Sequence, residues 1–368
     1  MKIATFNVSM EADNYRKTRT DPRQSNALKQ RLANGEHRQI KNIAEIIQRT
    51  RPDIILLNEF DYIPDPNQGV EAFIRHYLQV GQRGAQPVDY PFYFVAPVNT
   101  GIASPFDIDG DGIASGTAGD AWGFGHYPGQ YGMVLLSRFP IDYDKIRNFQ
   151  NLKWHTMPNA QSILNVDGSD FYDATTWQGL RLSSKSHWDV PILIENNLVH
   201  VLAAHPTPPV FDGPEGRNGA RNFDEIRLWA DHISDDGAPY LIDDQGKQGG
   251  LPEGRRFVIL GDYNASPDEG SSRPGAIQQL LQHPAVNGDF VPTSQGGAAH
   301  SPDNPYAATH TAQWRARVDY VLPSKRGFEI LDGGVFWPHK HSPLHRLIAH
   351  RGASSDHRLV WLELALTD

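Results

Sequence analysis

Short, continuously apolar runs recur along this chain, and each stops at a polar residue. The stretch "FVILGDYNASP" (257–267) shows the pattern, because an apolar run ending at Leu260 is followed at once by Asp262 and Asn264. Runs of this length, bounded by turn-forming residues, are typical of strands buried on both faces. Strands of this kind need cover on both sides, which constrains the fold more than any other feature.

Further strands and two helices are predicted from local patterns. The segment 37–51 places Ile40, Ile43 and Ile47 on one face of an amphipathic helix, and Pro52 marks its end. The segment 220–234 shows a similar period and is predicted to be helical. The predicted strands cover residues 2–8, 53–60, 131–137, 198–205, 256–264, 317–323 and 358–366.

The strand patterns continue across the whole chain, which predicts one domain over residues 1–368. The length of 368 residues suits one large core or two ordinary domains, so length alone does not decide. Gly/Pro-rich segments at about 97–130, 206–219 and 237–254 read as long surface loops rather than linkers, because strands lie on both sides of each.

Composition excludes several classes of protein. The chain has no cysteine, which removes thiolate nucleophiles, disulfides and cysteine-bound metals. No apolar run approaches the roughly 20 residues that span a bilayer. The net charge of −9 offers no basic field for a polyphosphate backbone, so nucleic acid is not the favoured partner. No serine-hydrolase or P-loop motif is present.

The cellular location and the oligomeric state stay open from the sequence. Met1 and Lys2 lead directly into a predicted strand, without a signal peptide. The chain therefore reads as a cytoplasmic protein or as a mature secreted or periplasmic form with an added methionine, and we favour the mature form.

Polar residues that are costly to bury stand at or near the ends of the predicted strands. Taken singly, such residues are explained by the polarity of loops at strand ends. As a series that includes two histidines and a glutamate, they suggest a shared partner such as a metal ion, or contact with each other. The residues are Asn7, Glu59, His205, Asp262, Asn264, Asp319, Asp356 and His357.

These residues occur in motifs that resemble the endonuclease/exonuclease/phosphatase superfamily, which includes DNase I-like nucleases, sphingomyelinases and inositol polyphosphate phosphatases. The resemblance covers almost the whole chain and implies a four-layer α/β sandwich, with two packed mixed sheets flanked by helices. The motifs are "TFNV", "LLNEF", "AAHPTP", "LGDYNASP", "RVDYVL" and "SSDHRLV", in that order.

The resemblance also implies a divalent metal site. Glu59 would ligate the cation, with Asn7 and Asp356 at or near the same ion. Carboxylate and amide oxygens suit Mg²⁺ or Mn²⁺, which keep waters for substrate oxygens.

The remaining residues would act on the phosphate. By the same resemblance, Asp262 would orient or deprotonate an attacking water, and Asn264 would hold that water or a phosphoryl oxygen. His205, and His357 steered by Asp319, would donate to the developing charge and the leaving oxygen. In-line attack at phosphorus needs positioning and charge stabilisation more than a covalent nucleophile, which agrees with these roles.

The sequence thus predicts a metal-dependent phosphoesterase that hydrolyses a small phosphate ester, a phosphodiester in our preferred version. A DNase I-like nuclease is the competing enzyme, and it would need a groove for a polyanion. A non-catalytic binding module on the same fold is the competing class, and it is disfavoured because every chemical position is filled.

The segment "RLSSKSHWDVP" (181–191) reads as a basic strand near the phosphate site. Alternate residues of a strand point the same way, so Arg181, Lys185 and His187 would share a face. Lys185 and His187 are the candidates for binding substrate oxyanions. The alternative is an ordinary solvated strand face, and the sequence does not separate the two.

The loop "DIDGDGIASG" (107–116) resembles part of a calcium loop. Asp107, Asp109 and Asp111 occupy its first, third and fifth positions, but the closing acid is missing at Ala118, and Asp120 lies two residues on. An EF-hand is not expected, because clear flanking helices are absent. We expect a structural Ca²⁺ here, and a tight acidic turn without an ion is the alternative.

Overall fold

Two β-sheets form the centre of the protein. The computed structural model describes residues 1–15, 26–234 and 237–367. One sheet has the order β10 (Phe328–Val335), β11 (Val360–Leu366), β1 (Lys2–Met10), β2 (Ile54–Phe60), β4 (Met133–Ser137), β3 (Phe92–Phe94). The other has the order β5 (Arg147–Asn148), β6 (His187–Ile194), β7 (Asn197–Ala204), β8 (Arg256–Asp262), β9 (Asp319–Pro323).

Both sheets are mixed, and they pack face to face. The pairs β1–β2 and β7–β8 are parallel, whereas the other pairs are antiparallel. β1 contacts β8 and β9 across the interface between the sheets. Phe6 and Leu57 of the first sheet share one buried apolar cluster with Val201 and Val258 of the second. This shared core holds the ends of strands from both sheets close together.

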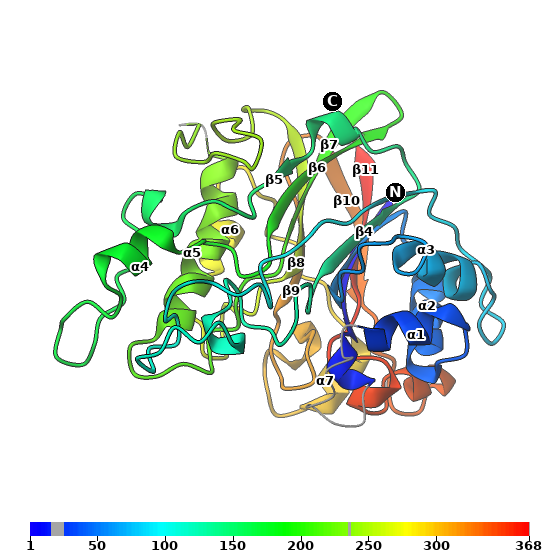
Figure 1. Cartoon of the computed structure of the whole chain (residues 1–368). Coiled ribbons are helices and arrows are strands. Elements are labelled where there is room, and N and C mark those ends of the chain that lie inside the picture. The colour runs from blue at the N-terminus through cyan, green and yellow to red at the C-terminus, as the bar shows by residue number, and fades with distance from the viewer. Residues whose placement is uncertain (16–25, 235–236, 368) are drawn as a thin grey trace.

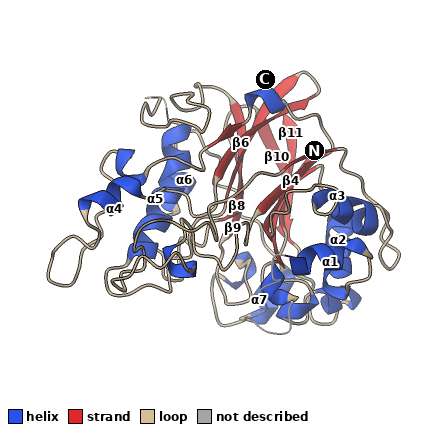
Figure 2. Cartoon of the chain, viewed as in Figure 1, coloured by secondary structure: helices blue, strands red, loops and turns tan. Residues whose placement is uncertain are grey.

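Helices cover the outer faces of the two sheets (Figures 1 and 2). On one side lie α1 (Ala27–Ala33), α2 (Arg38–Thr50) and α3 (Val70–Phe73), and on the other α4 (Ala174–Gly179), α5 (Arg217–His232) and α6 (Gln278–Leu281). The short α7 (Gln295–His300) lies near the lower end of the sheets in this view. The order helix, sheet, sheet, helix confirms the four-layer α/β sandwich.

The two predicted helices form where their apolar stripes indicate. Ile40, Ile43 and Ile47 of α2 are fully buried. The helix ends at Thr50, because Arg51 has a left-handed φ of 51° that breaks the helical geometry before Pro52. α5 begins at Arg217, three residues before the predicted start, because Gly216 adopts a left-handed conformation with φ of 61° ahead of it. The loop predicted over 206–219 is shorter by the same residues.

The structure corrects the predicted strand over 181–191. β6 begins only at His187, so the alternation that placed Arg181, Lys185 and His187 on one face does not hold. The backbone of the preceding residues makes other hydrogen bonds: Glu225 accepts from the Ser184 amide at 2.6 Å, and the Asn99 amide donates to the Lys185 carbonyl at 2.9 Å. These contacts take the place of a strand ladder.

The remaining long loops agree with the sequence in outline. Residues 97–130 contain a short 3-10 turn (Ala118–Asp120) and isolated bridges but no longer element, and residues 237–254 are irregular. No helix among the described residues is both long and apolar enough to cross a bilayer.

Candidate active site

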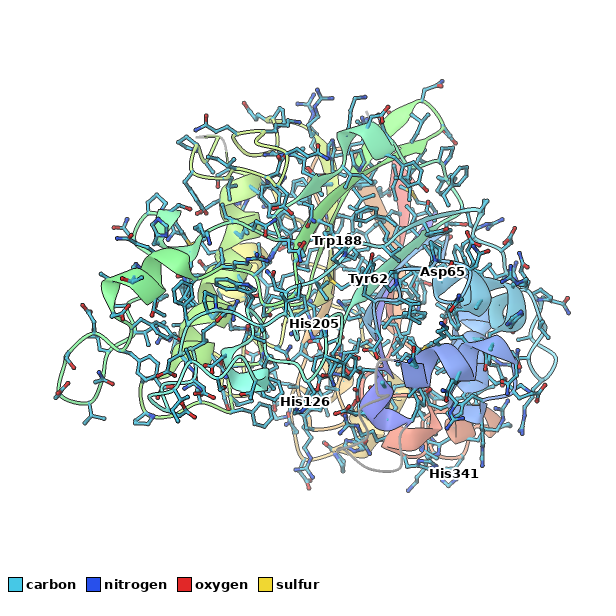
Figure 3. All side chains as sticks on the ribbon, in the orientation of Figure 1. Tyr62, Asp65, His126, Trp188, His205 and His341 are labelled. Carbon is cyan, nitrogen blue, oxygen red and sulfur yellow. The ribbon has the colours of Figure 1, made fainter. Side chains whose placement is uncertain are left out.

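The strand ends bring the predicted polar residues together around one carboxylate. Oδ2 of Asp262, at the end of β8, accepts a hydrogen bond from Asn7 Nδ2 at 3.0 Å. His205 Nε2 and His357 Nε2 each lie 3.5 Å from the same oxygen. Figure 3 shows His205 near the middle of the molecule, far from the exposed His341 at its periphery. Asp262 is therefore the centre of the candidate site.

Left-handed backbone conformations redirect the chain at three of these strand ends. Ser9, Glu59 and Asn264 have φ values of 48°, 56° and 51°. Such conformations cost non-glycine residues roughly 1–3 kcal/mol each and tend to occur at functional sites. Asn264 also donates from its backbone amide to Asp262 Oδ1 at 3.0 Å and from Nδ2 to the Pro206 carbonyl at 3.1 Å. The turn after β8 is thus tied to the residue that follows His205.

His357 and Asp319 form a buried dyad. Asp319 Oδ2 lies 2.9 Å from His357 Nδ1, and both residues are less than 5% exposed. Burial by itself lowers the pKa of His357, but the carboxylates of Asp319 and Asp262 outweigh it and raise the pKa to about 10. His357 therefore carries a proton near neutral pH and directs Nε2 toward Asp262.

His205 has the opposite electrostatic environment. Burial lowers its pKa well below the ordinary value, and the positive charges of Lys185 and His357 lower it further. Its Nδ1 is buried without a hydrogen-bond partner among the described residues. His205 is accordingly a neutral imidazole beside the charged His357.

Glu59 is a half-buried carboxylate in an acidic environment. Burial raises its pKa, and the nearby carboxylates of Asp356 and Asp262 raise it further, whereas His357 and the amide of Asn7 oppose the shift. A divalent cation would favour the ionised form of Glu59, since a metal is often the largest local charge in such a site. This oxygen donor set fits a Mg²⁺ or Mn²⁺ ion.

Asn7 and Asp356, the other predicted metal ligands, are held by Ser9. Asn7 Oδ1 accepts from the Ser9 amide at 3.1 Å, and the Ser9 hydroxyl donates to Asp356 Oδ1 at 3.1 Å. The second oxygen of Asp356 lies 3.3 Å from Arg351 Nε. The sequence does not single out Ser9, because only its contacts in the folded protein show that it holds Asn7 and Asp356. The "SSD" motif gives Ser355, whose hydroxyl lies 3.0 Å from that of Ser9.

Lys185 and His187 differ in what they can offer a substrate. Lys185 is only 5% exposed, and its Nζ makes no hydrogen bond or ion pair with a described residue. Burial lowers its pKa, whereas Glu225, Glu59 and Asp262 raise it, so the ammonium lies within the field of the site. His187 instead has both ring nitrogens engaged, with Ser183 Oγ at 2.6 Å and the Glu225 carbonyl at 2.8 Å. The structure gives His187 a packing role and leaves it no free nitrogen.

Glu225 on α5 is a positioning residue that the sequence did not reveal. Its carboxylate accepts from the backbone amides of Ser184 and Thr207, both at 2.6 Å. It thereby holds the segments that carry Lys185 and His205. The sequence offers one indication of this role: Glu225 is a charged residue on the inward face of the predicted helix.

A cluster of carboxylates also forms in the 107–120 loop, with a different membership from the predicted one. Asp107, Asp109 and Asp120 can each place an oxygen within 4.8 Å of the others. Asp111 is exposed and caps Ile113 instead, at 2.8 Å. The 3-10 turn at Ala118–Asp120 folds Asp120 back into the loop, where it is fully buried.

The fold and the site define a class of protein: a two-sheet α/β sandwich with acidic and imidazole groups gathered at the strand ends. A model of the Endonuclease/Exonuclease/phosphatase family matches residues 4–357. The chain belongs to this family, and the hydrolases of the family generally act on phosphate esters. No curated protein matches the chain.

Solved structures are similar to this chain at low sequence identity. An endonuclease/exonuclease/phosphatase from Beutenbergia cavernae DSM 12333 is 18% identical, covering 100% of this chain and 71% of that one, with a TM-score of 0.53. Sphingomyelinase C from Streptomyces griseocarneus is 14% identical over 98% of each chain, with a TM-score of 0.45. A beta toxin variant from Staphylococcus aureus with bound magnesium ions is 12% identical over 98% of each chain, with a TM-score of 0.45.

Proposed function

We propose that this protein is a divalent-metal-dependent phosphoesterase that hydrolyses a small phosphodiester by in-line attack of water. The observation that carries the proposal is the environment of Asp262, whose Oδ2 faces Asn7, His205 and His357 within 3.5 Å, beside the half-buried Glu59. Hydrogen-bond acceptors, a protonated imidazole and a neutral imidazole stand together, as attack at phosphorus requires. One domain over the whole chain would carry this activity.

In this proposal Asp262 accepts the proton of the attacking water or orients that water. The Asn7 amide, at 3.0 Å, fixes the Asp262 carboxylate. His357, charged and held by Asp319, donates to a phosphoryl oxygen, and the neutral His205 donates through Nε2. Asn264 offers its Oδ1, since its Nδ2 is engaged with Pro206.

Glu59, with Asn7 and Asp356, would hold Mg²⁺ or Mn²⁺. Such an ion supplies charge neutralisation and a fixed position for a phosphoryl oxygen. Lys185 contributes a second positive charge from a dry position, where electrostatic contacts are stronger than in water. Lys185 is retained as a substrate-binding residue because its Nζ makes no hydrogen bond or ion pair with a described residue.

A substrate panel tests the proposal. Purified protein is assayed with bis-p-nitrophenyl phosphate, p-nitrophenyl phosphate and plasmid DNA, each with Mg²⁺, Mn²⁺ or Ca²⁺ after removal of bound metal. We expect the diester to be hydrolysed fastest, with Asp262→Asn inactive and the exposed Asp65→Asn as a matched control that keeps activity. Preferred cleavage of plasmid would favour a nuclease, and no turnover on any substrate would favour a binding module.

A further inference from the structure

Trp314 is a large aromatic side chain exposed beside the candidate active site. Its ring centroid lies 4.7 Å from that of His357, with an angle of 83° between the planes, and the residue is 50% exposed. Tryptophan carries a large apolar surface, so leaving half of it in water next to a reactive imidazole forgoes stabilisation. The exposed part of the ring is therefore available to a ligand that reaches His357.

The backbone holds Trp314 in this position. A tight turn closes over residues 312–316, where the Ala312 amide donates to the Ala316 carbonyl at 3.1 Å. Ala312 also bridges to His357, and the Gln313 amide donates to the Asp356 carbonyl at 2.7 Å. The turn is thus attached to the segment that carries the site residues. Main-chain contacts before and after Trp314 in sequence therefore hold its backbone beside His357.

An open surface cavity of about 540 Å³ adjoins the same turn, and Arg315 lines it together with the acids Glu269 and Asp303. Arg315 has a φ of 74°, and its exposed guanidinium makes no hydrogen bond or ion pair with a described residue. Glu269, on the cavity wall, is already engaged by Asn304 at 2.6 Å and by His310 at 2.7 Å. Asp303, the other acid among the described residues of the wall, makes no ion pair with Arg315, so the guanidinium is open to a ligand.

We propose that Trp314 and Arg315 form a subsite for the organic group esterified to the phosphate, and that this group contains a polar ring. The ring stacks on Trp314, and its polar substituents bond to Arg315 in the cavity. This inference rests on the proposed function for the placement of the phosphate at His357, and it adds the class of substrate. A ring is favoured because the exposed indole offers a flat surface, and polar substituents are favoured because the cavity holds an unpaired cation.

Binding of three phosphate monoesters tests the subsite. Adenosine 5′-phosphate carries a planar ring and a sugar ring, ribose 5-phosphate carries a sugar ring only, and glycerol phosphate is acyclic. Affinities are measured by calorimetry with Mg²⁺ in an Asp262→Asn background, which prevents turnover during the titration. When one nucleobase stacks on an aromatic side chain, replacing that side chain with alanine weakens binding by about tenfold or more.

We expect adenosine 5′-phosphate to bind at least about tenfold more tightly than glycerol phosphate, with ribose 5-phosphate between the two, and Trp314→Ala to remove this difference. Trp314→Phe should restore most of it, which a merely structural role would not predict. Arg315→Ala should weaken the cyclic esters more than glycerol phosphate. Tyr143→Ala is the control, because Tyr143 is a 52% exposed aromatic residue outside the site.

Three results would overturn the subsite: equal binding of all three esters, a difference that persists in Trp314→Ala, or no binding of either cyclic ester at millimolar concentration. These outcomes are separable from the hydrolysis panel. Turnover of bis-p-nitrophenyl phosphate without ring discrimination would reject only the subsite. Ring discrimination without turnover on any substrate would reject only the hydrolase.

Discussion

At the level of single residues, burial and charge give the two site histidines opposite protonation states. Asp319 and Asp262 keep the proton on His357, whereas burial and neighbouring positive charges keep it off His205. The charged imidazole of His357 can donate a proton, and the neutral imidazole of His205 can still donate a hydrogen bond. The arrangement depends chiefly on Asp319, which contacts His357 directly.

Asp319→Asn should therefore shift the alkaline limb of the rate profile to lower pH. The Asp319 carboxylate has the largest effect among the negative charges that raise the pKa of His357 to about 10, so its removal lowers the pKa and the proton is lost earlier as pH rises. The measurement is kcat/KM for bis-p-nitrophenyl phosphate against pH at constant saturating Mg²⁺, because metal-bound water titrates too. An alkaline limb at the same pH in both proteins would separate Asp319 from the protonation of His357.

His187 gives a prediction about stability. Burial lowers its pKa from 6.5 to about 4, although the charge and the carbonyl of Glu225 oppose the shift. Because the folded-state pKa is depressed, the stabilisation is complete above about pH 6.5 and is lost as pH falls toward 4. In wild type, the free energy of unfolding should fall by up to about 1.4 kcal/mol per pH unit in this range because of His187, and His187→Gln should remove this contribution. Urea unfolding from pH 7 to 4.5 measures both slopes, and equal slopes would contradict the assignment.

At the level of elements, strong local patterns predicted structure well. α2 and the buried strands β1, β2, β7 and β8 follow from apolar runs or stripes that neighbouring residues define. β10 was missed because Glu329, Asp332 and two glycines interrupt its pattern, and pairing with β11 supplies the order instead. The short helices α4 and α7 have too few residues to show a period.

The acidic loop at 107–120 remains a predicted calcium site. Burial and the neighbouring carboxylates, led by Asp120, raise the pKa of Asp109, so an ion should stabilise the loop by mass action. Adding Ca²⁺ to chelated protein should raise the melting temperature, and Asp109→Ala should remove most of that rise while leaving Mg²⁺-supported turnover in place. The control is Asp111→Ala, because Asp111 is exposed and lies outside the cluster; its melting temperature should still rise when Ca²⁺ is added. Calcium shifts of the same size in wild type and Asp109→Ala would remove the loop from consideration.

At the level of the whole molecule, the packing of two sheets converts distant sequence motifs into one site. Asn7 and Asp262 are 255 positions apart in sequence, yet Nδ2 of Asn7 lies 3.0 Å from Oδ2 of Asp262. The polar residues at strand ends could be predicted, because each stands out against its own apolar run. Ser9, Glu225 and Trp314 could not, because their roles come from contacts between segments that no local pattern joins.

The charge of the whole chain predicts its preference for small substrates. With 43 acidic against 34 basic residues, few phosphate contacts are available beyond the site itself. For duplex DNA, the logarithm of the binding constant falls with the logarithm of the salt concentration, with a slope of roughly −0.9 per phosphate contact. Hydrolysis of a small diester should therefore be faster than plasmid cleavage and nearly independent of salt between low and physiological concentrations. Plasmid degradation that is efficient at low salt and falls steeply as salt rises would favour the nuclease instead.

The most direct test of the proposed metal-dependent site is turnover in Glu59→Gln. Initial rates on bis-p-nitrophenyl phosphate are measured across Mg²⁺ and Mn²⁺ concentrations, alongside melting temperature and the exposed Glu253→Gln as a matched control. Loss of metal-supported charge stabilisation, worth several kcal/mol, predicts a fall of roughly a hundredfold or more in Glu59→Gln. Its melting temperature should be unchanged or higher, because a carboxylate close to the negative charges of Asp262 and Asp356 is removed. Normal turnover of Glu59→Gln at limiting metal would contradict the account.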